Sequence, residues 1–169
     1  MKKIVLTFGL ISGAILSALM LTSMSFIGTI SFGTAEVLGY TTILLVSLLT
    51  FFGVRRYREN AGGHLTFGTG FLVGLLITLV SCSIYVATWE LVYFKLAPGL
   101  GDKYAAMMVE EVKASGASQA KIDQTIRDTE KFKAYYADPL FNVAITFAEP
   151  FPIGLVVSLI SAAVLRKKA

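Results

Sequence analysis

A glutamate followed by two closely spaced prolines, Glu149-Pro150-Phe151-Pro152, is the most unusual run of residues in this chain. It lies inside an apolar stretch, about 24 Å from Leu165 if the stretch is helical. Prolines within a helix remove backbone hydrogen bonds and kink it, so Pro150 and Pro152 mark a predicted kink. An ionisable side chain at hydrocarbon depth is costly, which makes Glu149 a candidate ligand or ion site. The alternative is that Glu149 is neutral or hydrogen-bonded and only braces the kink.

Two further acidic residues lie near the ends of apolar stretches. Glu36 opens one stretch, where a carboxylate suits the N-terminus of a helix. Glu90 lies beside Trp89 and is expected at headgroup level, within an aromatic belt. A helix N-terminus for Glu36 and a headgroup-level position for Glu90 are the ordinary structural interpretations. Together with Glu149 they could instead form an outward-facing site for a proton, a cation or a basic ligand, and the sequence leaves open whether the three carboxylates meet.

A basic cluster, Arg55, Arg56 and Arg58, directly follows one apolar stretch. Arginines at this position commonly set the orientation of a membrane protein. They are also candidates for binding anionic lipid headgroups.

Other chemistries have no support in the sequence. The chain has no phosphate-binding loop, dinucleotide fingerprint, zinc-ligand spacing or Gly-x-Ser-x-Gly elbow. His64 has no second metal ligand nearby, and Cys82 has no accompanying base and orienting group. We therefore expect no metal and no cofactor, and the missing catalytic constellation disfavours an intramembrane enzyme without excluding one.

Four apolar stretches must position these residues, at about 4–27, 36–54, 65–94 and 140–165. Charged residues make up only 15% of the chain, whereas about 25% is usual in soluble domains. Roughly 20 apolar residues cross about 30 Å of hydrocarbon, and a helix satisfies its own backbone hydrogen bonds there. We predict an all-α integral membrane protein, a single domain over residues 1–169 with four transmembrane helices.

The one long polar segment, about 98–138, separates the third and fourth apolar stretches. It is predicted to form an amphipathic helical hairpin, with Asp102 capping the first helix, Gly116 ending it and Ser118 capping the second. Apolar and small residues recur at helical spacing in the second helix, namely Ile122, Ile126, Thr129, Phe132 and Tyr136. Such a stripe is expected to lie on the membrane surface or on the ends of the spans, rather than free in solvent.

The distribution of Lys and Arg predicts the orientation of the four spans. The two termini and the loop after the second span together carry eight basic residues and one acid, a net charge of +7. Residues 95–138, which are the polar segment together with the preceding Lys95, are neutral, with seven basic and seven acidic residues. The positive-inside rule puts both termini in the cytoplasm and the hairpin outside. A cleaved signal peptide is the alternative for the first stretch, which is longer than a usual signal core.

Small residues spaced by four suggest close helix–helix packing in lipid. They occur at Gly9, Gly13 and Ser17, at Gly70 and Gly74, and at Gly154, Ser158 and Ala162. Packing within the chain is the favoured interpretation, and a homo-oligomer is the alternative.

A series of short motifs follows in order along the chain: Phe52-Gly53-Val54-Arg55-Arg56-Tyr57-Arg58, Thr66-Phe67-Gly68, Gly70, Phe71, Gly74, Tyr85, Trp89-Glu90, Asp102-Lys103-Tyr104, Phe132-Lys133, Tyr136, Pro139, Thr146-Phe147, Glu149-Pro150-Phe151-Pro152 and Gly154. In this order the motifs resemble the domain-of-unknown-function family 4199. Pro98-Gly99-Leu100 departs from the Pro-Asp-Phe expected there. The resemblance implies an uncharacterised multi-pass protein of the bacterial inner membrane and supplies no activity.

Two functions remain open on these grounds. The favoured one is a non-enzymatic membrane protein that binds lipid or a partner protein, with the hairpin as the recognition surface. The alternative is a small transporter or channel subunit that uses the outward acids and the proline-broken fourth helix. The expected partners are the lipid bilayer and another membrane protein or a second copy of the chain. Nucleic acid is not expected, since the basic residues adjoin apolar stretches.

Overall fold

The computed structural model describes residues 1–167, which are almost entirely helical. The elements are α1 (Lys2–Ser23), η1 (Met24–Phe26), α2 (Phe32–Asn60), α3 (Phe67–Leu91), η2 (Val92–Leu96), α4 (Leu100–Ala114), α5 (Gln119–Tyr136), α6 (Pro139–Ala148) and α7 (Pro150–Leu165). Within this range the only extended pairings are two isolated bridges. The predicted all-α fold is confirmed.

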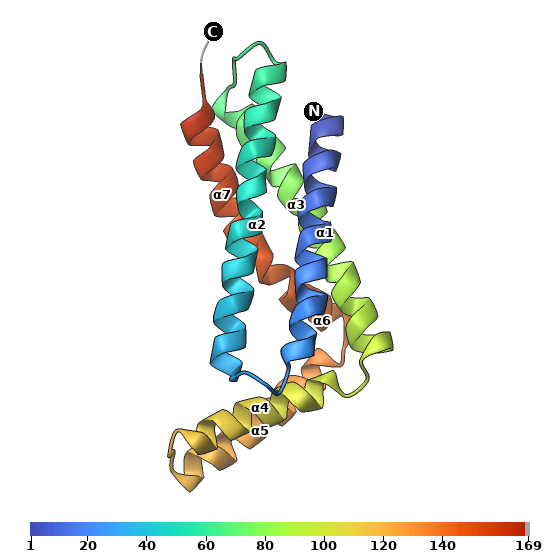
Figure 1. The fold of residues 1–169 in the computed structure, drawn as a ribbon, viewed down its shortest axis with the longest axis vertical. Helices are drawn as coiled ribbons and strands as arrows, with labels where there is room; N and C mark the ends of the chain where they lie inside the picture. The colour runs from blue at the N-terminus through green and yellow to red at the C-terminus, as the bar shows by residue number, and fades with distance from the viewer. Residues whose placement is uncertain (168–169) are drawn as a thin grey trace.

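Four helical units are long and apolar enough to cross a membrane: Lys2–Phe26, Phe32–Asn60, Phe67–Leu96 and Pro139–Leu165. They are 25 to 30 residues long. They lie side by side in one bundle, with both ends of the chain and the α2–α3 loop at one end (Figure 1). These four apolar helices indicate a multi-pass membrane protein.

The second span is longer than the predicted stretch of 36–54. The side chain of Ser31 accepts a hydrogen bond from the Thr34 amide and so caps α2 earlier, and the helix then runs through the basic cluster to Asn60. Hydropathy falls at the arginines, but arginine is a good helix former. The apolar stretch therefore ends before the helix does.

Glycines allow α3 to pack closely against α1 and α7. A Cβ added at Gly9 of α1 would lie 2.7 Å from Val80 Cβ, and one at Gly74 of α3 would lie 2.9 Å from Ser158 Cβ. A side chain at Gly154 of α7 would collide with Thr78 of α3. The predicted small-residue stripes therefore lie in contacts within the chain.

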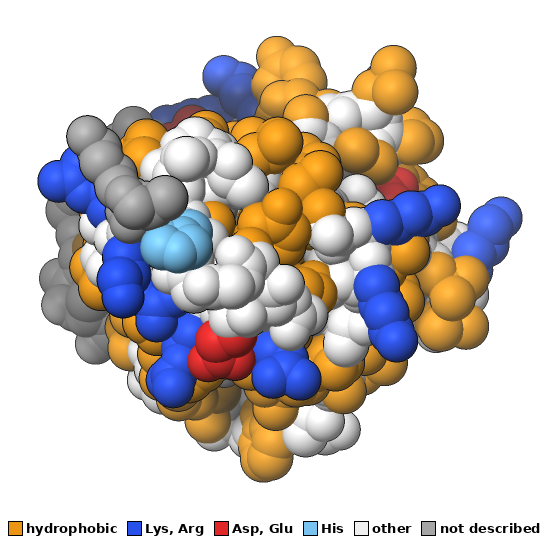
Figure 2. All heavy atoms as spheres, turned by 90° about the horizontal axis from the view of Figure 1, so that it is seen from above, with side chains coloured by type: hydrophobic (Ala, Val, Ile, Leu, Met, Phe, Trp, Pro, Cys, Tyr) orange, Lys and Arg blue, Asp and Glu red, His pale blue; other side chains and the backbone are white. Residues whose placement is uncertain are grey.

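The end that holds both termini is held together by backbone hydrogen bonds. Leu65 and Lys167 exchange two N–H···O=C bonds of 2.9 Å each, which tie the segment after α7 to the start of α3. Lys and Arg side chains surround this end (Figure 2). Lys168, which contributes to the predicted basic end, lies outside the described residues.

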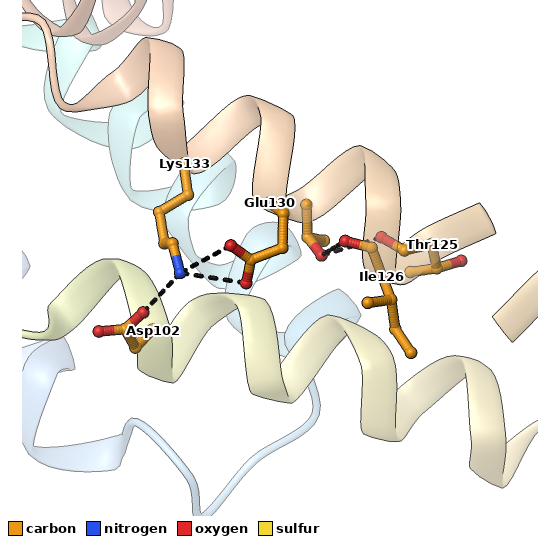
Figure 3. Close-up of polar contacts among 6 residues, drawn as sticks. Asp102, Thr125, Ile126, Glu130 and Lys133 are labelled. Atoms are coloured by element: carbon orange, nitrogen blue, oxygen red, sulfur yellow. Dashed lines mark hydrogen bonds and ion pairs between the residues drawn. The ribbon is translucent and has the colours of Figure 1, made fainter. Parts of the chain in front are cut away.

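At the opposite end, α4 and α5 run side by side (Figure 1). Lys133 of α5 points at Asp102 of α4, with its Nζ 2.8 Å from Asp102 Oδ1 and 3.0 Å from Glu130 Oε2 (Figure 3). Ser118 caps α5 as predicted, by accepting a bond from the Lys121 amide. Gly116 lies after the end of α4, with φ at 73°.

The predicted capping role of Asp102 is wrong. The N-cap of α4 is Gly99, whose φ of 85° is a left-handed conformation suited to glycine. The helix therefore begins at Leu100, before Asp102. The carboxylate of Asp102 lies in the first turn and pairs with Lys133 instead.

The predicted stripe on α5 includes both buried and exposed positions. Thr125, Thr129 and Tyr136 are buried, whereas Ile126 and Phe132 are 41% and 49% exposed. The two threonines donate hydrogen bonds to carbonyls of their own helix, Thr125 to Lys121 and Thr129 to Thr125. The buried threonine hydroxyls are therefore satisfied within α5, without a polar partner on another helix.

The glycine packing gives a first prediction. Ala at Gly74 should destabilise the protein by about 1–3 kcal/mol, because the added methyl group meets Ser158 Cβ and cannot be accommodated without moving a helix. Gly39 of α2 is the matched control, since a Cβ there has nothing within 4 Å. Gly39→Ala should leave stability unchanged or raise it by up to about 1 kcal/mol. Thermal unfolding in detergent measures both; equal melting temperatures for the two variants would contradict the packing described.

Candidate functional site at the break in the fourth span

The fourth span is divided into two helices at Glu149. α6 ends at Ala148 and α7 begins at Pro150, with Glu149 between them at φ −72° and ψ −61°. Neither Pro150 nor Pro152 has an N–H to donate, so the carbonyls four residues earlier lose their helical partners. The break therefore lies at the predicted prolines, and it sets a carboxyl group beside freed backbone carbonyls.

Glu149 is oriented toward a tyrosine of the neighbouring span. The hydroxyl of Tyr85 on α3 donates a hydrogen bond of 3.3 Å to Glu149 Oε2, although the two residues are 64 positions apart in the chain. The Glu149 side chain is partly buried. The carboxyl group is thus directed into the bundle rather than toward lipid.

Two further tyrosines lie within electrostatic reach of Glu149, and both come from outside the spans. Burial raises the pKa of Tyr136 on α5 to about 12, and the charge of Glu149 adds to that effect. Burial also raises the pKa of Tyr104 on α4, again with a contribution from Glu149. Both phenols are therefore neutral and able to donate a proton in a hydrogen bond near pH 7. Of the three tyrosines, Tyr85 is hydrogen-bonded to the carboxyl group at the break, and Tyr104 and Tyr136 interact with it electrostatically.

A buried network of neutral polar groups extends over the two helical turns before the break. Asn142 Nδ2 donates to the Tyr136 carbonyl at 3.0 Å, and Thr146 Oγ1 donates to Asn142 Oδ1 at 3.2 Å. The Tyr136 hydroxyl lies 2.9 Å from Thr146 Oγ1. Asn142 and Thr146 are 0% and 1% exposed. Each polar group has a partner, as burial in an apolar environment requires, and the network joins α5 to α6.

Sequence reasoning did not identify Asn142 or Thr146 as site residues. The available signal was their spacing of four within an apolar stretch, which places both on one face of a helix. Polar residues at that depth are expected to face the bundle interior.

Trp89 and Glu90 lie where the spans meet the α4–α5 pair. The ring of Trp89 is 5.9 Å from that of Tyr93, which in turn meets Tyr136 edge-on at 5.1 Å. Glu90 Oε1 is buried and has no hydrogen-bond partner among the described residues. These aromatic rings pack against α5 instead of forming only a belt toward lipid.

The three acids proposed as one site are not joined in the described part of the chain. Glu36 is exposed on α2 and shares no hydrogen bond or ion pair there with Glu90 or Glu149. No group of three acidic, histidine or cysteine side chains within residues 1–167 is arranged to hold a metal ion. Of the three, Glu149 accepts a hydrogen bond from a side chain of another span, that of Tyr85. Arg55, Arg56 and Arg58 lie at the opposite end of the bundle (Figure 1).

Comparison with known proteins identifies a family. The family described as "Protein of unknown function (DUF4199)" matches residues 7–167, nearly the whole chain. No curated protein and no solved structure matches the chain significantly. The resemblance inferred from the sequence motifs is thereby confirmed.

The site gives a second prediction, for Glu149→Gln. Glutamine keeps an acceptor for the Tyr85 hydroxyl but cannot ionise, so the variant should fold with nearly wild-type stability. If Glu149 binds a proton or a cation, the wild-type melting temperature should vary with pH or added cation, and that dependence should be absent in the variant. Glu36→Gln, at an exposed acid, is the matched control and should behave like wild type. Identical profiles for wild type and Glu149→Gln would leave Glu149 a structural role only.

Proposed function

We propose that this chain, which belongs to the DUF4199 family of proteins of unknown function, is a non-enzymatic protein of the bacterial cytoplasmic membrane whose α4–α5 pair binds the lipid surface. Both termini are in the cytoplasm, and the α4–α5 pair lies on the outer face. The observation that carries the proposal is the apolar surface that α5 leaves exposed beside the spans.

That surface continues into the fourth span. On α5, Ile126, Phe132 and Tyr135 are exposed, and the first turn of α6 adds Leu140, which is 82% exposed. The ring of Phe141 on α6 lies 6.3 Å from that of Phe132 and 5.8 Å from that of Tyr135. Because α6 begins a membrane-spanning unit, a surface continuous with it reaches the boundary between headgroups and acyl chains. Amphipathic helices bury their apolar face about 5–10 Å into that boundary.

The charge of the polar segment that contains α4 and α5 favours lipid binding by insertion of apolar side chains. Residues 95–138 carry seven basic and seven acidic residues, which balance. A neutral segment gains little from anionic headgroups. Its membrane affinity therefore rests on buried apolar area, at about 25 cal/mol per Å².

The orientation rests on the other end of the bundle. That end combines the termini and the α2–α3 loop, with a net charge of +7 in the sequence. Basic residues in short loops remain on the cytoplasmic side.

A second candidate function is favoured by the break at Glu149. Discontinuous helices with freed carbonyls and an ionisable side chain are the usual ion sites of transporters. Here the Tyr85 hydroxyl is hydrogen-bonded to the Glu149 carboxyl group at such a break. A four-span chain would have to form an oligomer to enclose a path. Ion flux into liposomes that is lost in Glu149→Gln would support this function over the first.

The lipid-surface proposal predicts the effect of two charges on α5. Changing Ile126 and Phe132 together to Asp should detach the α4–α5 pair, at a cost of a few kcal/mol from roughly 25 cal/mol per Å² of apolar area. Gln124 and Ala134, which are exposed and uncharged, form the matched control when both are changed to Asp. Hydrogen exchange of residues 100–136 in lipid nanodiscs should rise in the first double variant only. Unchanged exchange and unchanged protease resistance in that variant would refute the proposal.

The orientation predicts which positions an impermeant thiol reagent reaches in intact cells. Cys82 is buried and is first replaced by Ser. Single cysteines at Lys3 and Asn60, both exposed, should then be shielded because they lie in the cytoplasm, whereas one at Ser115 should be labelled. The reverse pattern would invert the proposed orientation. Labelling at Lys3 together with Ser115 would instead indicate three spans.

A further inference from the structure

A groove runs between α2 and α7 on the flank of the bundle. Its volume is about 490 Å³, within the range of small-molecule sites. Its walls are formed chiefly by Leu44, Leu48 and Phe51 of α2 and by Ile153, Val156 and Ile160 of α7. The one hydroxyl, that of Ser161, donates to the Val157 carbonyl at 2.6 Å. The groove therefore offers only apolar surface, at the depth of the hydrocarbon.

The α2 wall of the groove ends in two arginines. Leu44, Leu48 and Phe51 are spaced by four and three residues, and the same spacing continues to Arg55 and Arg58. This spacing keeps all five positions on one face of the helix. Phe51 and Arg55 are about 6 Å apart along the helix axis. The apolar groove is thus followed, on the same face, by basic side chains.

Arg58 lies across the end of the groove. Its Nη1 donates to the carbonyl of Leu165, the last residue of α7, at 3.4 Å. A guanidinium group has five N–H donors in a planar fork, so one bond to a carbonyl leaves capacity for an anion. Arg166 and Lys167 follow Leu165 and are both exposed. Basic groups from α2 and from the end of α7 therefore meet above one apolar groove.

The remaining arginines of the cluster are accessible. Arg55 and Arg56 contact Glu59 at 3.1 and 3.4 Å, with both arginine side chains more than half exposed. Exposed ion pairs of this kind contribute about 0–1 kcal/mol. Glu59 therefore does not prevent the arginines from binding a stronger anion.

We propose that the α2–α7 groove and the basic groups at its end form a binding site for one anionic phospholipid. An acyl chain lies along Leu48 and Ile160, and the phosphate is held by Arg58 and Arg55. This site is at the opposite end of the bundle from the α4–α5 pair, and it depends neither on the function proposed for that pair nor on the orientation.

The dimensions favour a lipid over a helix from a second copy of the chain. From Arg58 to Leu44 the distance along α2 is about 21 Å, which fits a headgroup plus one leaflet of about 15 Å of hydrocarbon. A transmembrane helix would need a contact along roughly the full 30 Å of the bilayer core. The charge at the end of the groove also complements a phosphate, whereas the exposed residues of an apolar helix carry no such group.

The test uses the full-length protein purified in detergent and two lipids with identical acyl chains, phosphatidylglycerol and phosphatidylcholine. Native mass spectrometry counts the lipids retained per chain, and thermal unfolding reports the stabilisation. We expect one phosphatidylglycerol to be retained per chain and to raise the melting temperature, with weaker retention of phosphatidylcholine. Equal retention of the two lipids would overturn the proposal.

Variants separate the headgroup contacts from the groove. Arg55→Gln and Arg58→Gln should each weaken phosphatidylglycerol binding by about fivefold. Arg58→Gln also loses the hydrogen bond to the Leu165 carbonyl. If that loss destabilises the protein, Arg55→Gln, which keeps this bond, still tests the headgroup contacts. Leu48→Trp should fill the groove and abolish retention, and Arg127→Gln, at an exposed arginine of α5, should have no effect.

Three results would contradict the site. An unchanged lipid preference in Arg55→Gln and Arg58→Gln would show that these arginines do not bind the headgroup. Normal retention in Leu48→Trp would show that the groove does not hold the acyl chain. A dimer that dissociates only in Leu48→Trp would show that a second copy of the chain occupies the groove. The Ile126 and Phe132 double variant should bind phosphatidylglycerol normally, so failure at one end of the bundle is distinguishable from failure at the other.

Discussion

The close approach of α3 to α1 and α7 is the contact on which the rest of the bundle depends. Lipid is as apolar as the helices themselves, so burial of apolar area does not drive spans together, and association rests on close packing and hydrogen bonds. Gly9, Gly74 and Gly154 provide that packing, because each lies where a Cβ would meet another helix. Hydrogen bonds between spans add to it, such as Ser17 to Thr88 at 2.9 Å.

This packing explains how a proline-broken span can be stable. A break in a lone helix would expose carbonyls to hydrocarbon, at several kcal/mol each. Here α3 lies against both halves of the fourth span, and Tyr85 on α3 supplies a donor to the carboxyl group at the break. The buried Asn142, Thr146 and Tyr136 network then connects the same region to the end of α5. The break, the tyrosines and the α4–α5 pair thus form one connected region at this end of the bundle.

The two ends of the bundle offer lipid two different surfaces. One end is neutral overall and presents exposed aromatic and aliphatic side chains on α5 and α6. The other presents Lys and Arg side chains around a small polar surface (Figure 2). Insertion of apolar side chains suits the first, and attraction of anionic headgroups suits the second. A difference of this kind between the ends also tends to hold a membrane protein at a fixed depth and orientation.

Properties that are summed along a short segment could be predicted from the sequence alone. Hydropathy over some 20 residues indicated four spans, and the positions of Ser118 and Gly116 gave the helix ends between α4 and α5. The motifs identified the family. The prolines located the break, since proline lacks the amide hydrogen wherever it occurs. None of these inferences requires knowing which residues of other helices lie nearby.

Only the tertiary structure decided which side chains meet. Helix rotation and crossing bring Tyr85 to Glu149, whereas Glu36, which has a similar place in the sequence pattern, remains exposed. The same rotation buries Thr129 and leaves Phe132 on the surface, contrary to their hydrophobicity. The groove between α2 and α7 likewise requires two helices far apart in the chain to lie side by side. Such contacts depend on packing between helices, which a hydrophobic pattern along one helix does not determine.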